Sequence, residues 1–112
     1  KEDQPDMNPL DRTFLKKLYR IVDEHIGEEE FNITAMGQEM GMSRTSFYSK
    51  IKALFGDSPQ NFLTSYRLEK ALELLKTRQY NVSEVAWQVG FSTLSGFSKS
   101  FKKKFGIPPS EA

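Results

Sequence analysis

The feature that most constrains the fold of this chain is an internal repeat. Residues 33–56 read ITAMGQEMGMSRTSFYSKIKALFG, and residues 82–106 read VSEVAWQVGFSTLSGFSKSFKKKFG. Glycine, serine and apolar positions recur at an offset of 49 residues, which becomes 50 after one extra residue in the second copy. A supersecondary pattern that occurs twice predicts two similar folded units in one chain.

Each copy carries the same order of helix and turn signals. A small residue, Gly37 or Ala86, is followed four positions later by a glycine, Gly41 or Gly90. The small residue allows a second helix to cross closely, and the later glycine can take the left-handed conformation of a sharp turn. A serine N-cap then starts the second helix. This order predicts a helix-turn-helix in each copy.

The second helix of each copy combines an apolar stripe with a basic face. Apolar residues recur every four positions, which predicts a helix with one buried side. They are Phe47, Ile51 and Phe55 in the first copy and Phe97, Phe101 and Phe105 in the second. The stretches 40–56 and 91–106 hold three and four basic residues and no acidic residue, in a chain of net charge +1. Basic charge gathered in this way is typical of a surface that binds a polyanion.

The faces opposite the apolar stripes hold the side chains that we expect to read DNA. Arg44 can donate two hydrogen bonds to guanine, and Lys99 is the leading base reader of the second copy. Tyr48 is long enough to reach a base or a phosphate; the alternative is that its ring packs beside Phe47. The predicted base-reading residues are Arg44, Thr45, Tyr48, Ser49, Leu94, Ser95, Ser98 and Lys99.

Phosphate contacts, which position a protein without reading the sequence, are predicted for a second set of residues. Ser43 and Ser92 are expected to cap the two helices, whose first backbone N–H groups can also bind phosphate. The predicted phosphate-contacting residues are Ser43, Lys50, Lys52, Ser92, Lys102 and Lys103. For Lys104 we expect a solvated side chain.

The chain before the first copy predicts a linker and then a helix. Residues 1–8 have the composition of a polar linker from an upstream domain. Asn8 followed by Pro9 is typical of a helix start, and apolar positions recur at helical spacing from Leu10 onward. The first helix-turn-helix subdomain is therefore assigned to residues 9–57.

A long central helix is predicted between the two copies. Ser58 and Pro59 start it, and its length would be roughly 27 Å at about 1.5 Å per residue. Apolar residues leave little of it wholly polar, so we expect neighbours on more than one side. The boundaries are 58–77 for this linker helix and 78–112 for the second subdomain. The predicted fold is all-α and homeodomain-like, with two helix-turn-helix subdomains joined by the central helix.

Three side chains outside these patterns each have two interpretations. Arg67 would either contact phosphate or pin the central helix through a carboxylate. Trp87 lies off the apolar pattern of its helix, and would either pack or contact a partner. His25 is the only histidine, and its acidic neighbours favour a surface role over a metal site.

Several classes of function are excluded or disfavoured. The chain has no cysteine, which excludes disulfides, thiolate metal sites and cysteine nucleophiles. It has no glycine-rich phosphate loop and no cluster of metal ligands, so we predict no catalysis, no cofactor and no metal. No apolar run approaches 18 residues, and we expect a cytoplasmic domain without membrane contact.

Three segments resemble the AraC/XylS family of transcription activators. They are RLEKALELLK at 67–76, NVSEVAWQVGF at 81–91 and FSKSFKKKFGIPP at 97–109. The stretch SRTSFYSKIKALFG is most like the output domains of two-component regulators, including hybrid sensor–regulators. The resemblance implies about seven helices and binding to a bipartite DNA site as a monomer. Gly96 departs from the family pattern, in which a bulkier residue is common.

The basic helices and the resemblance together predict sequence-specific binding to double-stranded DNA at a bipartite promoter site. One recognition helix from each copy would enter successive major grooves, about 34 Å apart. The alternative is a protein-interaction module that contacts RNA polymerase or a regulatory partner. An upstream sensory or receiver domain is expected to control the activity.

Overall fold

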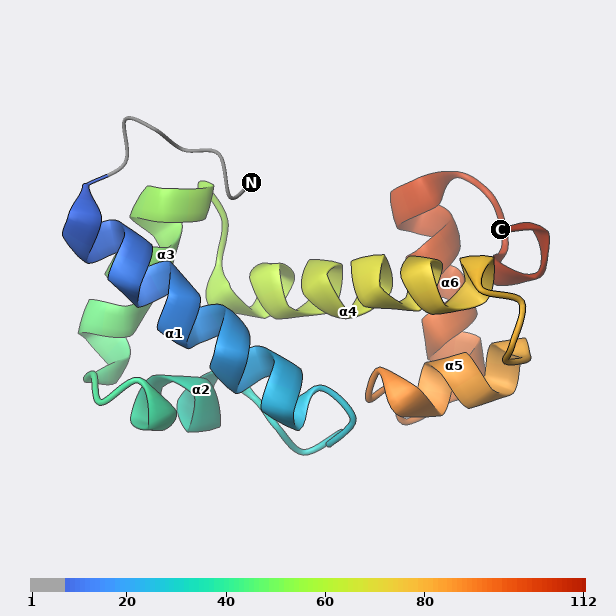
Figure 1. Ribbon diagram of the computed structural model, residues 1–112, viewed down its shortest axis with the longest axis horizontal. Coiled ribbons are helices and arrows are strands. Elements are labelled where there is room, and N and C mark those ends of the chain that lie inside the picture. The colour runs from blue at the N-terminus through green and yellow to red at the C-terminus, as the bar shows by residue number, and fades with distance from the viewer. Residues whose placement is uncertain (1–7) are drawn as a thin grey trace.

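Two helix-turn-helix units lie at opposite ends of one long helix in the computed structural model, which describes residues 8–112 (Figure 1). The helices are α1 (Pro9–His25), α2 (Ile33–Glu39), α3 (Arg44–Phe55), α4 (Pro59–Lys76), α5 (Val82–Gln88) and α6 (Leu94–Phe105), followed by the short 3-10 helix η1 (Pro109–Glu111). The all-α prediction is confirmed, with six α-helices and a 3-10 turn in the described part of the chain. The expected linker falls almost wholly in residues 1–7, which lie outside the described residues.

Side-chain caps fix where the helices begin. Asn8 Oδ1 accepts a hydrogen bond from Leu10 N at 2.7 Å, and Ser58 Oγ accepts one from Asn61 N at 3.2 Å. A proline occupies the first turn of α1 and of α4, where its missing N–H removes no hydrogen bond. The predicted starts of both helices are therefore confirmed.

The turn between the two helices of each unit depends on its glycine. Gly41 and Gly90 have φ angles of 72° and 89°, in the left-handed region that favours glycine. A Cβ atom on Gly37 would lie 3.5 Å from the Phe47 ring, so α3 crosses α2 at close range. Ala86 is fully buried at the matching position of α5. These positions confirm the predicted helix-turn-helix in both copies.

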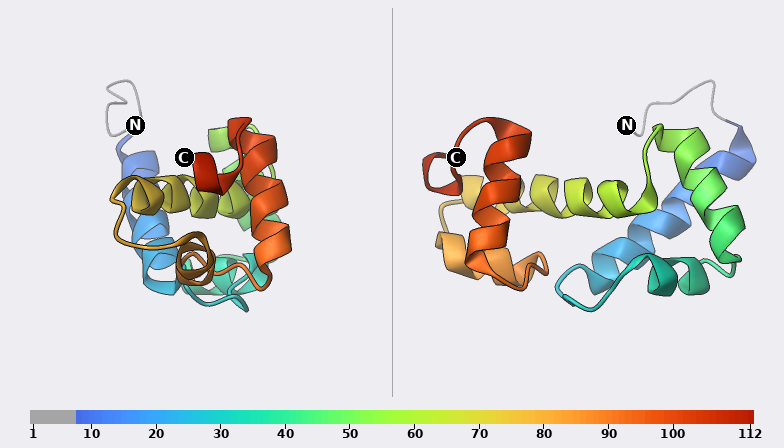
Figure 2. Two further views of the ribbon diagram at one scale, coloured as in Figure 1. Left: turned by 90° about the vertical axis from the view of Figure 1, so that its right-hand side faces the viewer. Right: turned by 180° about the vertical axis from the view of Figure 1, so that it is seen from behind.

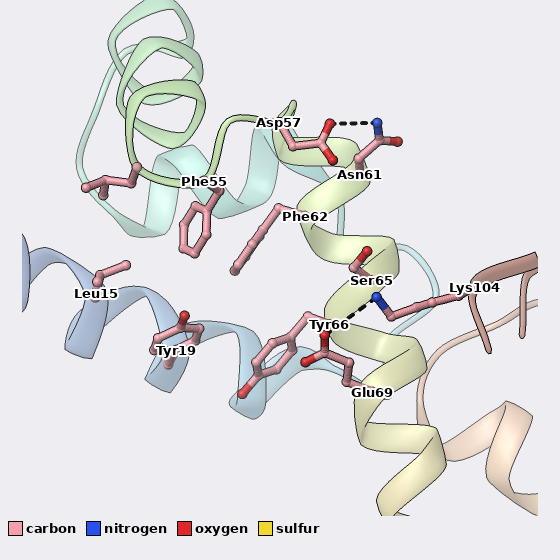
Figure 3. Close-up of a pocket in the computed structure, with 11 residues that line it drawn as sticks. Leu15, Tyr19, Phe55, Asp57, Asn61, Phe62, Ser65, Tyr66, Glu69 and Lys104 are labelled. Atoms are coloured by element: carbon pink, nitrogen blue, oxygen red, sulfur yellow. Dashed lines mark hydrogen bonds and ion pairs between the residues drawn. The ribbon is translucent and has the colours of Figure 1, made fainter. Parts of the chain in front are cut away.

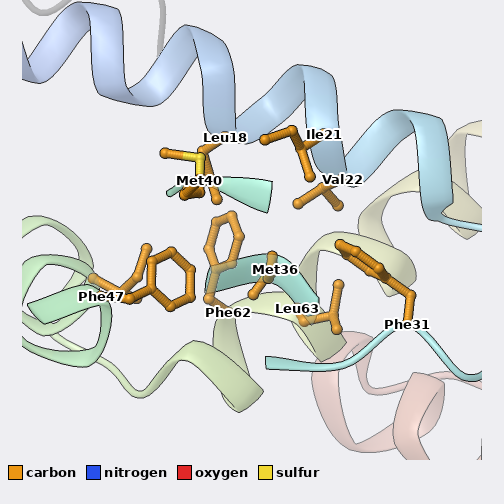
Figure 4. Packing of buried hydrophobic residues seen from close by; sticks show 10 residues of the cluster. Leu18, Ile21, Val22, Phe31, Met36, Met40, Phe47, Phe62 and Leu63 are labelled. Carbon is orange, nitrogen blue, oxygen red and sulfur yellow. The ribbon is translucent and has the colours of Figure 1, made fainter. Parts of the chain in front are cut away.

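The central helix α4 belongs to two separate hydrophobic cores. Its N-terminal half gives Phe62 and Leu63 to a core shared with α1, α2 and α3 (Figure 4). Its C-terminal half gives Leu68, Ala71 and Leu75 to a second core shared with α5 and α6. Both halves of α4 are thus buried, each in a different core, in keeping with its apolar composition.

The apolar stripe of α1 is shorter than predicted. Leu10 is 78% exposed and contributes nothing to the core, so its inclusion in the stripe is wrong. Phe14, one turn later, is the first α1 side chain that packs against the buried cluster. The first turn of α1 is capped by Asn8, and Asp11 in the same turn pairs with Lys50 of α3. Across residues 8–112, no helix is both long and apolar enough to cross a membrane.

Candidate nucleic-acid interface

Helices α3 and α6 lie on the same face of the molecule, at opposite ends of α4 (Figure 2). Seen from behind, both are in front of α4 and run in the same direction, with their N-terminal ends at one edge. Helix α1 lies on the opposite face (Figure 1). The fold therefore presents the second helix of each repeat on one surface, with the two helices separated along α4.

Helix α3 exposes the predicted readers of the first copy. Phe47 and Ile51 are fully buried, which turns the opposite side of the helix to solvent. Tyr48 is 46% exposed, so its ring is not part of the core and the packing alternative is not observed. The exposed residues on this side are Arg44, Thr45, Tyr48, Ser49 and Lys52.

Helix α6 presents the equivalent surface of the second copy. Phe97 and Phe101 are fully buried. Among the predicted readers Ser98 is half-buried, and the exposed ones are Leu94, Ser95 and Lys99. Lys102 and Lys103 are exposed further along the helix. The structure therefore brings both sets of basic and hydroxyl side chains to one face.

The N-cap of α6 is Thr93, and the prediction of Ser92 as the cap is wrong. Thr93 Oγ1 accepts a hydrogen bond from Gly96 N at 3.0 Å. The extra residue of the second copy precedes the cap, so Thr93 is the counterpart of Ser43, whose Oγ accepts from Ser46 N. A Cβ atom on Gly96 would lie 2.9 Å from Thr93 Oγ1, which explains the glycine at this position. Two adjacent hydroxyl residues made the position of the gap ambiguous in the sequence.

Replacing Thr93 with valine should lower the free energy of unfolding by about 1 kcal/mol, because the side chain keeps its shape but loses the capping oxygen. Ser92→Ala is the matched control and should change the stability by less than about 0.5 kcal/mol. Urea denaturation of both variants measures the difference. Equal losses in the two variants would contradict the assignment of Thr93 as the cap.

Two lysines of the basic helices form ion pairs within the chain. Lys50 pairs with Asp11 of α1 at 2.5 Å, and its Nζ lies 5.7 Å from the centre of the Phe14 ring. This pair holds α3 against α1 and would compete with the predicted phosphate contact of Lys50. Lys104 pairs with Glu69 of α4 at 3.6 Å instead of being simply solvated.

Arg67 follows neither of its two predicted interpretations. Its Nη2 donates to the backbone carbonyls of Glu28 at 2.9 Å and Phe31 at 3.4 Å, so it pins the loop between α1 and α2 to α4. Burial lowers the pKa of Arg67. Its Nε is buried and has no hydrogen-bond partner. The residue is a structural arginine at the junction of the two units.

The other two uncertain side chains are placed by the structure as follows. Trp87 is 52% exposed, so it does not pack in the second core. His25 Nδ1 lies 3.0 Å from the Glu28 carboxylate, and its ring stacks on Phe31 with centres 4.7 Å apart. Within the described residues, no group of three or more potential ligands is arranged to hold a metal ion.

A groove of about 440 Å³ lies between α1, α4 and the C-terminal end of α3 (Figure 3). Tyr66 in its wall donates its hydroxyl hydrogen to Asp23 Oδ1 at 2.7 Å; burial and this contact raise the pKa of Tyr66. The ion pair of Lys104 with Glu69 lies at its rim (Figure 3). No predicted DNA-contacting residue lines this groove, so it is separate from the surface of α3 and α6.

The fold and its basic surface agree with the comparisons to known proteins. A family model described as "Helix-turn-helix domain" matches residues 36–112. The C-terminal domain of the two-component response regulator yesN from Fusobacterium nucleatum has a similar structure, with a TM-score of 0.79 and 28% identity over 88% of this chain and 96% of that one. The chain belongs to the AraC family of helix-turn-helix domains. The resemblance noted in the sequence is thus confirmed.

Two further comparisons bear on function. The DNA-binding domain of AdpA, solved in complex with a target DNA, has a TM-score of 0.78 and 29% identity over 87% of this chain and 86% of that one. A "Histidine kinase P4" from Formosa agariphila is 40% identical over 105 residues, which are 94% of this chain but 8% of the kinase. The chain spans less than half the length of the curated relatives it matches. The family is non-catalytic, which confirms the prediction that this domain is not an enzyme.

Proposed function

We propose that this chain is the sequence-specific DNA-binding domain of a transcription regulator and places α3 and α6 in successive major grooves of a bipartite site. The observation that carries the proposal is the exposure of both basic helices on one face, aligned in the same direction. A DNA duplex presents its major groove again after one helical turn, about 34 Å further along. The complex of the related AdpA domain with its target DNA supports the same class of ligand.

Helices α3 and α6 would contribute unequally to recognition of the DNA sequence. In α3, Arg44 can donate a bidentate pair to guanine O6 and N7, and Tyr48 is exposed close to it. In α6, Lys99 is the main candidate for base contact. Phosphate contacts are assigned to Lys52, Lys102 and Lys103 and to the N–H groups that begin each helix, next to the caps Ser43 and Thr93. The first copy would therefore supply most of the sequence discrimination.

Control of the domain would come from other parts of a longer protein. Relatives include a histidine kinase and the C-terminal domain of a two-component response regulator, which supports an upstream sensory or receiver domain and a cytoplasmic location. The exposed Trp87 favours a second, compatible function, which is contact with a protein partner such as RNA polymerase, because tryptophan is enriched at protein interfaces.

Binding to a selected DNA site should weaken steeply with salt, because each phosphate contact releases a counterion. The slope of log K against log salt is about −0.9 per phosphate, so Lys102→Ala and Lys103→Ala should each reduce its magnitude by about 1. Lys50→Met removes a lysine that already pairs with Asp11 and should leave the slope unchanged. Fluorescence anisotropy over a range of salt concentrations measures these slopes. A slope near zero in the unmutated chain, or no binding at low salt, would refute the proposed function.

A further inference from the structure

The two units touch at a second place besides α4. The loop between α1 and α2 runs beside α5 in both views of the fold (Figures 1 and 2). Ile26 of this loop packs against the second core, although it belongs to the first unit by sequence. A Cβ atom on Gly27 would lie 3.2 Å from the carbonyl oxygen of Gln88, and one on Gly90 would lie 2.3 Å from the carbonyl oxygen of Ile26. The backbones of the two units approach so closely that a side chain at Gly27 or Gly90 would crowd a carbonyl oxygen of the other unit.

The repeat itself provides a comparison for this contact. Gly41 occupies the position in the first copy that Gly90 occupies in the second, and both have positive φ angles. Around Gly41 nothing lies within 4 Å of an added Cβ atom. In the first copy, the positive φ angle of the turn is therefore the only feature that favours glycine. In the second copy the approach of the Ile26 carbonyl is an additional requirement, and it exists only because the two units touch.

Arg67 of α4 also takes part in this contact between the two units. It lies between Leu63, which belongs to the first core, and Leu68, which belongs to the second. Its guanidinium donates to two carbonyls of the α1–α2 loop, and its Nη2 would lie 3.0 Å from a Cβ atom on Gly90. One side chain thus reaches the loop of the first unit and the turn of the second.

From this geometry we infer that Arg67 is a positioning residue that sets the half-site spacing this domain accepts. A single connecting helix resists rotation of its two ends only through its own stiffness. A second contact away from the helix axis opposes both bending and twisting, and so fixes α6 relative to α3. Since one added base pair turns the second half-site by about 35° and moves it by about 3.4 Å, a rigid pair of readers discriminates against it. The inference rests on the proposed function.

The test compares Arg67→Met with the unmutated chain on three DNA duplexes. One carries a site selected from random DNA, one has a base pair inserted between the half-sites, and one has the half-site of α6 scrambled. The insertion should weaken the unmutated chain by about tenfold or more, on the scale of a mismatched base pair. In Arg67→Met the selected site should bind about tenfold more weakly, while the insertion should cost less than about threefold. Binding to the duplex with one intact half-site should be the same for both proteins.

Two further variants keep the test decisive. Gly27→Val inserts a side chain against the Gln88 carbonyl without removing a charge or a hydrogen bond, and it should relax the spacing preference in the same way even if Arg67→Met folds poorly. Arg20→Met makes the same charge change at an exposed α1 position and should behave like the unmutated chain.

An unchanged insertion penalty in Gly27→Val, or in folded Arg67→Met, would overturn the inference and leave the proposed function intact. A loss in Arg67→Met that is equal on all three duplexes would also overturn it, because Arg67 would then act through DNA contact or overall stability. If the unmutated chain bound none of the duplexes, the proposed function would fail, and the inference with it.

Discussion

Phe97→Ala is expected to lower the free energy of unfolding by about 3–5 kcal/mol, the cost of removing a fully buried aromatic ring. Phe97 has no exposed surface and contacts the rings of Phe91 and Phe101, with centres 5.2 and 5.7 Å away. Because the two cores are separate clusters, the damage should be greatest in α5, α6 and the C-terminal half of α4. Hydrogen exchange should show lost protection in these helices before it does so in α1 to α3.

Phe105→Ala provides the control on the same helix. Its ring is only partly buried and packs at the margin of the second core, so the loss of stability should be clearly smaller than for Phe97→Ala. The two losses are compared by urea denaturation. Simultaneous loss of protection in all helices of Phe97→Ala would show that the two cores unfold as one cooperative unit, contrary to the expectation.

Arg44→Ala and Lys99→Ala are expected to relax sequence preference at two different places in the DNA site. Each lost base contact should reduce discrimination by about 1–3 kcal/mol, which corresponds to roughly 5- to 150-fold. The affected base pairs should lie about one helical turn apart, since α3 and α6 lie at opposite ends of α4. Selection of bound sites from random DNA for each variant measures both the position and the size of the effect.

Lys16→Ala is the control for these two variants, because Lys16 is an exposed lysine of α1. Helix α1 lies on the face opposite α3 and α6 (Figures 1 and 2). This variant should leave the preference unchanged at every base pair. If Arg44→Ala and Lys99→Ala weakened binding equally on all sequences, the two side chains would contact only phosphate. If both changed the same base pair, the arrangement with two grooves would be wrong.

Features that depend on neighbours within about four residues could be predicted from the sequence. The capping of α1 and α4, the left-handed glycines of the turns and the buried stripes of α3 and α6 all have this local origin. Two local predictions are wrong. Leu10 has the helical spacing of the α1 stripe but is exposed. The prediction of Ser92 as the cap in place of Thr93 arose because an inserted residue put two hydroxyl side chains next to each other. The comparison of the repeats therefore fixed the architecture but left the register uncertain by one residue.

Interactions between distant segments decided the roles of individual charged side chains. Lys50 has the same chemistry as the lysines of α6, yet it pairs with Asp11, 39 positions earlier in the chain. Arg67 is likewise bonded to carbonyls 36 and 39 positions away, which no pattern within α4 indicates. The exposure of Tyr48 and Trp87 also depends on which elements pack beside them.

The sequence by itself determined two helix-turn-helix units, a central helix and a basic face on each second helix. Helical periodicity, caps and turn glycines carry this information because their energies depend on residues one turn apart. Only the tertiary structure decided that α3 and α6 share one face, that Lys50 pairs with Asp11 of α1 and that Arg67 ties the two units together. These outcomes depend on how the halves of α4 are buried in two cores, and burial brings together residues that are far apart in the chain.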